Sequence, residues 1–241
     1  MGRGRAGRAT EALIPKGFKG RILWGHLGNR FYHRLLWLQL ALNHDLGPGP
    51  AATKVARKLL LLNPGDNMGV RYVLPFLLLE HGELSAATRA LKALADEPGL
   101  TASATRAFVA FAHADLATFR CELATALFTL PILRAFLLNN PKALHKDEQG
   151  YRGMRPDMEV FAEFAWPSYR ILPGLRAASI AFLAEPMVVE AERESRSYWA
   201  SYWETRRDLT ARRVGSRDGW ERLLAECIDR VAPANIHTSA R

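Results

Sequence analysis

Two carboxylates four residues apart, Glu159 and Glu163, are the side chains whose types and spacing come closest to those of a catalytic pair. On a helix they would share one face, with Asp157 just before them. Such a pair could bind a metal ion or act as general acid and base. No HExxH or P-loop motif occurs in the sequence, and no histidine-rich motif accompanies the pair. A solvated helix face is the preferred interpretation, so we expect no enzyme and no catalytic residues.

The seven histidines show no ligand spacing with Cys121 or Cys227, so no metal and no cofactor are expected. The two cysteines form neither a CxxC pair nor a disulfide framework, which favours a reducing compartment. The longest purely apolar runs, such as residues 73–79, are too short to span a bilayer. No secretory apolar region follows Met1. The sequence therefore predicts a cytoplasmic protein that does not enter a membrane, and a small-molecule substrate is not expected.

Asn67, Arg71 and Tyr72 are the first candidate binding residues. Asn67 and Arg71 are four residues apart at the start of a predicted helix, so they could face a groove together and bind an acidic group of a protein partner. In tetratricopeptide repeats the first helix of each pair lines the concave surface, which suits this placement. The alternative is that Arg71 pairs with Asp66 or a neighbouring helix and that Tyr72 belongs to the core.

A second candidate cluster lies at the entrance of the first predicted helix. Its polar and aromatic members are Trp24, His26, Asn29, Arg30, Tyr32 and His33. Asn29, Arg30 and His33 could form an edge that contacts a partner. In the alternative interpretation, Trp24 and Phe31 seal the first helical hairpin, and the cluster is structural.

Nucleic acid is the alternative partner, because the net charge of +9 is unevenly spread. Residues 1–34 hold eight Lys and Arg against one acid, Glu11, which gives +7 and leaves +2 for the other 207 residues. Such a tail could bind phosphate or an acidic protein, although a solubilising segment is the commoner role. The tail residues expected to contact nucleic acid are Arg3, Arg5 and Arg8.

Aromatic and arginine side chains alternate near the C-terminus, around Tyr198, Trp199, Tyr202 and Trp203. Aromatic groups beside arginines can stack bases or anchor a protein. Arg206 and Arg207 complete the expected nucleic-acid set. Residues 186–241 carry ten basic and nine acidic groups, however, so they produce no strong field for phosphate. The preferred interpretation is that this stripe docks the C-terminal helices onto the rest of the fold.

Apolar spacings of three and four residues predict helices along the chain, and no strand-like alternation occurs. In the first helix this spacing includes Phe31, Leu35, Leu38 and Leu42. The predicted helices cover residues 29–43, 51–62, 64–80, 85–96, 102–112, 115–129, 132–138, 156–165, 168–184 with an interruption at Pro173-Gly174, 186–213 and 218–231. The fold class predicted is all-α.

The turn between the second and third helices has a specific expected geometry. Asn63 is predicted to be the N-cap of the third helix and Pro64 its first residue. Asp66 would then lie in the first turn, where a carboxylate suits the helix dipole. Gly69 would lie inside the helix, where it costs about 1 kcal/mol relative to alanine and indicates a close neighbouring helix.

The first helices of successive pairs are expected near residues 29, 64 and 101, a period close to the 34 residues of a tetratricopeptide repeat. The usual Trp-x-x-Leu-Gly signature is missing, so the repeats would be degenerate. The sequence therefore predicts a degenerate tetratricopeptide-like α-solenoid, because a single helical hairpin cannot cover its own apolar face. A helical C-terminal extension follows.

Several stretches carry a family resemblance. They are Leu23-Trp24-Gly25 to Asn29-Arg30-Phe31 with Arg34, Leu61-Leu62-Asn63-Pro64-x-Asp66-Asn67-x-Gly69-x-Arg71-Tyr72, Leu77 to Leu79 with Gly82, Asn140-Pro141, and Tyr151-Arg152-Gly153-Met154 to Trp166. Over residues 20–185 the chain resembles the tetratricopeptide-like proteins related to the suppressor of tumorigenicity family. The resemblance implies a helical-repeat fold and an interaction role, and it brings no reaction with it. Animal members look membrane-associated, unlike this sequence.

Three segments are expected: a basic tail over residues 1–20, a helical-repeat domain over 21–185 and a C-terminal helical segment over 186–241. The function predicted is non-catalytic binding of another protein or peptide, as an adaptor or assembly subunit, through the concave face of the solenoid. Nucleic-acid binding through the tail and the C-terminal arginines is the alternative.

Overall fold

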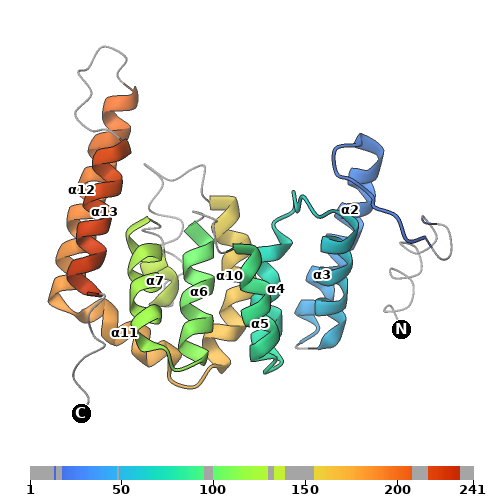
Figure 1. Ribbon diagram of the computed structural model, residues 1–241, viewed down its shortest axis with the longest axis horizontal. Helices are drawn as coiled ribbons and strands as arrows, with labels where there is room; N and C mark the ends of the chain where they lie inside the picture. Colours follow the sequence, from blue (N-terminus) through green and yellow to red (C-terminus); the bar gives the residue numbers. More distant parts are fainter. Residues whose placement is uncertain are drawn as a thin grey trace. The chain divides into compact units, whose positions relative to one another are not determined.

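The computed structural model describes residue 14 and residues 18–47, 49–94, 100–129, 133–138, 155–207 and 217–233. Every regular element within these ranges is a helix, so the predicted all-α class is confirmed (Figure 1). The chain divides into two compact units, Met1–Asp96 and Glu97–Arg241, here called the N-terminal and C-terminal units. Among the helices described, none combines the length and apolar character that crossing a bilayer requires.

The N-terminal unit is built from successive helices that pack on one another. They are α2 (Leu27–Asp45), α3 (Pro50–Leu62), α4 (Val70–Glu80), α5 (Leu84–Leu91) and the short 3-10 helix η1 (Lys92–Leu94). Helix α2 packs on α3, α3 on α4 and α4 on α5. The core of the unit is aliphatic at Leu36 and Leu40 of α2 and Leu59 of α3, and Phe76 of α4 adds an aromatic ring.

The third helix begins at Val70, so the prediction that it begins at Pro64 is wrong. Asn63 is the C-cap of α3 and not the N-cap of the next helix. Gly69 is the N-cap of α4, with a φ of +69°, and does not lie inside the helix. Only glycine adopts this left-handed conformation without steric cost, which gives the residue a different role from the predicted one.

Asp66 causes the late start of α4. Its two carboxylate oxygens accept hydrogen bonds from the backbone N–H groups of Val70 and Arg71, each at 2.8 Å. These two donors have no partner within the helix, and a carboxylate beside them also suits the positive end of the helix dipole. Asp66 itself has a φ of +43° and is buried. The loop of residues 63–69 is therefore a preformed cap.

The C-terminal unit is also entirely helical within the described ranges. Its helices are α6 (Leu100–Ala112), α7 (Leu116–Thr129), α8 (Leu133–Leu137), α10 (Arg155–Ile171), α11 (Leu175–Ala184), α12 (Pro186–Arg207) and α13 (Arg217–Val231). Helix α6 packs on α7 and on α10. Helices α12 and α13 lie side by side and both pack on α7 (Figure 1). The Tyr198 ring of the C-terminal stripe lies 6.0 Å from the ring of Trp220 and contributes to the contact between α12 and α13.

Helix α10 continues through Pro167 to Ile171, so the predicted end before Trp166 is wrong. Tertiary packing offsets the cost of the proline, because Phe164 and Tyr169 are fully buried on either side of it. The Tyr169 hydroxyl also donates a hydrogen bond of 2.9 Å to the carbonyl of Leu137. The predicted interruption at Pro173-Gly174 is confirmed.

Three helix pairs follow one another in the sequence, α2–α3, α4–α5 and α6–α7, and the helices of each pair pack together. Their first helices begin at Leu27, Val70 and Leu100, so the starts predicted near residues 29 and 101 are confirmed and the one near residue 64 is wrong. The starts are therefore unevenly spaced, because the Asp66 cap delays the second pair.

Candidate functional site

Helix α2 carries apolar side chains on two opposite faces. On the inner face, Leu36 and Leu40 are fully buried. On the outer face, the exposed fractions are 75% for Leu27, 62% for Phe31, 53% for Leu38 and 46% for Leu42. Helical geometry aligns these four positions in one row, which we call the outer stripe. A surface helix normally has polar groups there, and an exposed apolar row of this length is typical of an interaction site.

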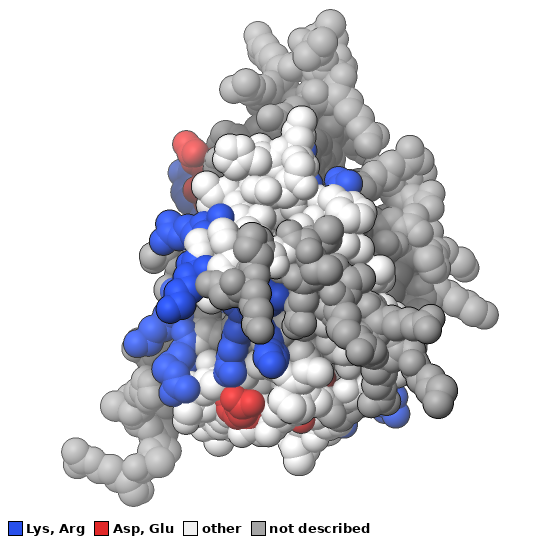
Figure 2. Space-filling model, turned by 90° about the vertical axis from the view of Figure 1, so that its right-hand side faces the viewer, with Lys and Arg blue, Asp and Glu red and all other residues white. Residues whose placement is uncertain are grey.

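Basic side chains occur on α2 and on the two chain segments that contact it. Arg34 follows Phe31 on the same side of α2, Lys54 and Lys58 come from α3, and Lys19 and Arg21 come from the segment before α2. Figure 2 shows several Lys and Arg side chains gathered on one face of the molecule, beside uncharged surface. Within the described part of the chain, these five side chains form no ion pair.

The charge of the chain resides almost wholly in the N-terminal unit. That unit has fourteen Lys and Arg against six Asp and Glu, a net charge of +8, whereas the C-terminal unit has nineteen against eighteen. Two of the six acids do not reach the surface: Asp66 caps α4, and Glu80 is buried against His44, 3.2 Å away. Within the described part of this unit, ten Lys and Arg accompany only two exposed acids, Asp45 and Glu83, so the surface they form is basic.

The predicted cluster before α2 fixes the entering chain. The Asn29 side chain donates a 2.9 Å hydrogen bond to the carbonyl of Leu23. Arg30 donates to the carbonyl of Trp24 at 3.2 Å, and its guanidinium lies 5.4 Å from the centre of the Trp24 ring. His33 is fully buried and is hydrogen-bonded to the carbonyl of Ile22. These contacts hold the segment before α2 against the helix.

The second predicted cluster lies at the start of α4. Arg71 lies 3.7 Å from the Asp66 carboxylate, as the alternative interpretation expected, and its guanidinium lies 5.3 Å from the centre of the Tyr72 ring. Asn67 is exposed, and its side-chain oxygen accepts a hydrogen bond from Asn63 at 3.4 Å. Asn67 and Arg71 therefore help to shape the capped turn.

Asn63 joins the two predicted clusters, which sequence spacing alone keeps forty residues apart. Its side-chain oxygen accepts the backbone N–H of Trp24 at 3.2 Å, and its amide nitrogen donates to Asn67. The backbone N–H of Ile22 also donates to the carbonyl of Leu62 at 2.9 Å. The segment before α2 is thus attached to the end of α3.

The remaining predicted residues fall partly outside the described structure. Arg3, Arg5 and Arg8 lie outside the described residues, and the side chains of Arg206, Arg207, Asp157 and Glu159 are not described either. Glu163 is exposed on α10. Within the described ranges, no three His, Cys, Asp or Glu side chains come together as a metal site would require.

Sequence reasoning did not identify the outer stripe as a surface. It treated Phe31, Leu35, Leu38 and Leu42 together with residues 36–40 as the apolar pattern that makes a helix. The available signal was the presence of two apolar rows on opposite sides of one helix, of which packing against a single neighbouring helix buries only one. Which row faces the core depends on the contact with α3.

No family model matches this chain, and no curated protein or solved structure is similar enough to match it.

Proposed function

We propose that the chain is a protein-binding module whose N-terminal unit docks a partner protein on the outer stripe of α2. The single observation that carries the proposal is the row of four exposed apolar side chains opposite a fully buried face. Burial of a leucine or phenylalanine contributes about 1.5–3 kcal/mol when it is complete. Four such groups together could offset a large part of the roughly 4–15 kcal/mol that association costs, and the charged contacts described next would add to them.

The surrounding charge defines the chemistry of the partner. Arg34 lies on α2 three residues after Phe31, Lys54 and Lys58 lie on α3, which packs on α2, and the unit carries a net charge of +8. A complementary surface presents an apolar row with acidic groups at its edges, because opposite charges speed encounter and fix orientation. The partner is therefore an acidic, amphipathic segment of another protein.

Protein fits this face better than nucleic acid does. A surface that binds phosphates would place several positive groups along its centre, whereas this face presents a row of four apolar side chains with a single arginine, Arg34, among them. In addition, Arg30 is held against Trp24. The proposal includes no catalytic step. We further propose that the chain acts as an adaptor in the cytoplasm. We also propose that its helix pairs stack as in tetratricopeptide repeats, which the successive packing of α2 to α5 supports.

The test is affinity purification of the full chain from a native extract, with and without nuclease, followed by mass spectrometry. Leu38→Glu introduces a charge into the centre of the outer stripe at an exposed position, so the fold tolerates it. We expect this variant to lose a stoichiometric acidic partner that the unmodified chain retains after nuclease treatment.

Met187→Glu is the matched control, because Met187 is 48% exposed but lies on α12 of the C-terminal unit. It should retain the partner. Equal recovery by Leu38→Glu and the unmodified chain would refute the proposal. Recovery that disappears with nuclease would show that the basic groups bind nucleic acid.

A further inference from the structure

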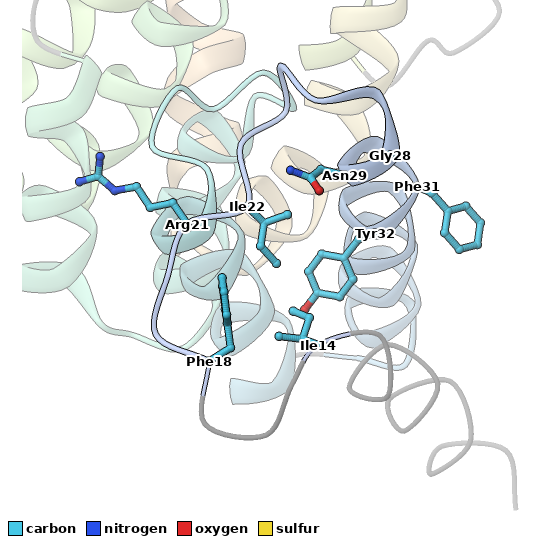
Figure 3. Close-up of a pocket in the computed structure, with 8 residues that line it drawn as sticks. All are labelled: Ile14, Phe18, Arg21, Ile22, Gly28, Asn29, Phe31 and Tyr32. Carbon is cyan, nitrogen blue, oxygen red and sulfur yellow. The ribbon is translucent and has the colours of Figure 1, made fainter.

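A pocket of about 390 Å³ lies next to the outer stripe, between the segment before α2 and the first turns of α2 (Figure 3). Its walls are mainly apolar and include Ile14, Phe18, Ile22 and Tyr32. Figure 3 shows these side chains directed toward a common space, while Phe31 points away from it. Phe31 belongs to both the pocket rim and the outer stripe, so the two features adjoin.

The Tyr32 hydroxyl is the unusual group of this pocket. Tyr32 is 5% exposed, and its hydroxyl is buried without a hydrogen-bond partner among the described residues. Buried polar groups are nearly always hydrogen-bonded, so an orphan needs an explanation. In Figure 3 the hydroxyl points to the part of the pocket lined by Ile14. A molecule in the pocket could therefore accept a hydrogen bond from it once the Ile14 side chain moves aside.

Positive charge lies close to the same wall. The Lys58 ammonium group lies 5.9 Å from the centre of the Tyr32 ring, and Arg21 contributes to the pocket lining. An occupant with a carboxylate next to its apolar part therefore matches the surroundings better than a neutral or basic one.

We propose that this pocket is the anchor site of the docking face and receives one large apolar side chain of the partner. The partner supplies an oxygen, such as a backbone carbonyl, that accepts a hydrogen bond from Tyr32, and an adjacent Asp or Glu that meets Lys58. The inference rests on the proposed function and adds the side-chain class that the partner inserts. Binding energy at interfaces concentrates in such pockets, where one aromatic or aliphatic anchor is fully desolvated.

Gly28 offers a clean way to close the pocket. It lines the pocket in the first turn of α2, and a Cβ atom placed on it would meet no atom within 4 Å. Gly28→Ala is therefore tolerated and leaves most of the space open. Gly28→Leu places a branched side chain where the anchor would lie. Gly25 has equally open surroundings but does not line the pocket, so Gly25→Leu is the matched control.

The test is an amide NMR titration of the labelled full chain with N-acetyl-aspartyl-phenylalanine amide, a probe that carries the carboxylate, the ring and the acceptors. We expect saturable shifts at Ile22, Gly28 and Tyr32 in the unmodified chain, Gly28→Ala and Gly25→Leu. Gly28→Leu should abolish them. Tyr32→Phe should weaken binding about three- to tenfold, the loss of one hydrogen bond, without lowering the melting temperature, because the hydroxyl has no partner in the free chain.

Three outcomes would overturn the anchor: no saturable shift, equal binding by Gly28→Leu, or equal binding of N-acetyl-lysyl-phenylalanine amide. A lower melting temperature for Tyr32→Phe would also contradict it, since the hydroxyl would then be bonded within the chain. Leu38→Glu separates this result from the proposed function. If the probe binds but Leu38→Glu still captures the partner, only the proposed role of the outer stripe is refuted. If Leu38→Glu loses the partner but no probe binds, only the proposed anchor pocket is refuted.

Discussion

The two units use their charged side chains in opposite ways. In the C-terminal unit, arginines bind carboxylates at short range and join helices. Arg106 lies 2.7 Å from Glu122, and Arg120 donates to both oxygens of Glu185 at 2.6 and 2.7 Å. In the N-terminal unit, ten Lys and Arg in the described ranges accompany four carboxylates, two of which are buried. Several arginines of the C-terminal unit hold helices together, whereas Lys19, Arg21, Arg34, Lys54 and Lys58 of the N-terminal unit form no ion pair within the described residues.

The two units therefore differ in whether their charged side chains are paired within the chain or are free to attract another molecule. An arginine bound by a carboxylate of its own chain is fixed in position and neutralised, so it adds little to the external field. A basic side chain without such a partner contributes its full charge to an approaching molecule. The outer stripe lies on the N-terminal unit, which is also the unit whose basic side chains are mostly not neutralised by carboxylates. The binding surface is therefore expected on the N-terminal unit.

The largest expected effect contrasts the two faces of α2. Leu36→Ala removes a fully buried side chain and should lower the free energy of unfolding by about 3 kcal/mol through lost burial and a cavity. Leu38→Ala, on the outer stripe, should change it by less than about 0.5 kcal/mol. Urea denaturation measures both. Similar losses for the two variants would show that the outer stripe is covered within the chain.

The next effect tests the structural use of charge in the C-terminal unit. The Glu192 side chain is 5% exposed and accepts hydrogen bonds from Arg134 at 2.6 Å and Arg196 at 2.7 Å. Glu192→Ala should cost about 3 kcal/mol, at the low end for a broken buried pair because both arginines reach solvent. The exposed pair of Glu190 with Arg193, 3.8 Å apart, is the control. Glu190→Ala should cost under about 0.5 kcal/mol, and a cost equal to that of Glu192→Ala would remove the distinction.

The Asp66 cap is the N-terminal unit's own structural use of charge. Asp66→Ala removes the acceptor of two backbone N–H groups and should cost about 2 kcal/mol. Asp66→Asn keeps one acceptor oxygen and should cost about half as much. Thermal unfolding compares the two variants, and equal stability of Asp66→Ala and the unmodified chain would show that the cap is dispensable.

The smallest effect concerns pH. The hydrogen bonds from Arg120 lower the pKa of Glu185 below its ordinary value of 4.5. The unfolded state therefore binds more protons between the two pKa values, and the stability that the pair contributes is present above pH 4.5 and is lost as pH falls through the lowered folded value. The melting temperatures of the unmodified chain and Glu185→Gln should differ most near pH 6 and converge in acid. A difference that stays constant down to pH 3 would contradict this.

The sequence predicts the class of the fold and most helices, because three- and four-residue periodicity needs no knowledge of neighbours. It fails where tertiary contacts decide. The periodicity does not show that Asp66 delays α4 until Val70, or that packing around Phe164 and Tyr169 carries α10 through Pro167.

The candidate site shows the same limit. Asn29 and Arg30 stand out in the sequence as possible binding residues, yet the fold uses them to hold Leu23 and Trp24 in place. The residues of the outer stripe are among those whose spacing predicts the helix. That they are exposed becomes clear only from the structure, in which α3 packs against the opposite face of α2. The spacing of residues in the sequence does not indicate that the Tyr32 hydroxyl lacks a hydrogen-bond partner; only the structure shows this.

The most direct test of the account is site-specific photo-crosslinking with p-benzoylphenylalanine at position 38, compared with position 187, in the full chain within a native extract. If the outer stripe binds the partner, a nuclease-resistant acidic protein is crosslinked at position 38 and not at position 187. Crosslinking at 187 alone, or none at 38 under conditions in which the partner is recovered, would contradict the claim that the outer stripe of α2 is the docking surface.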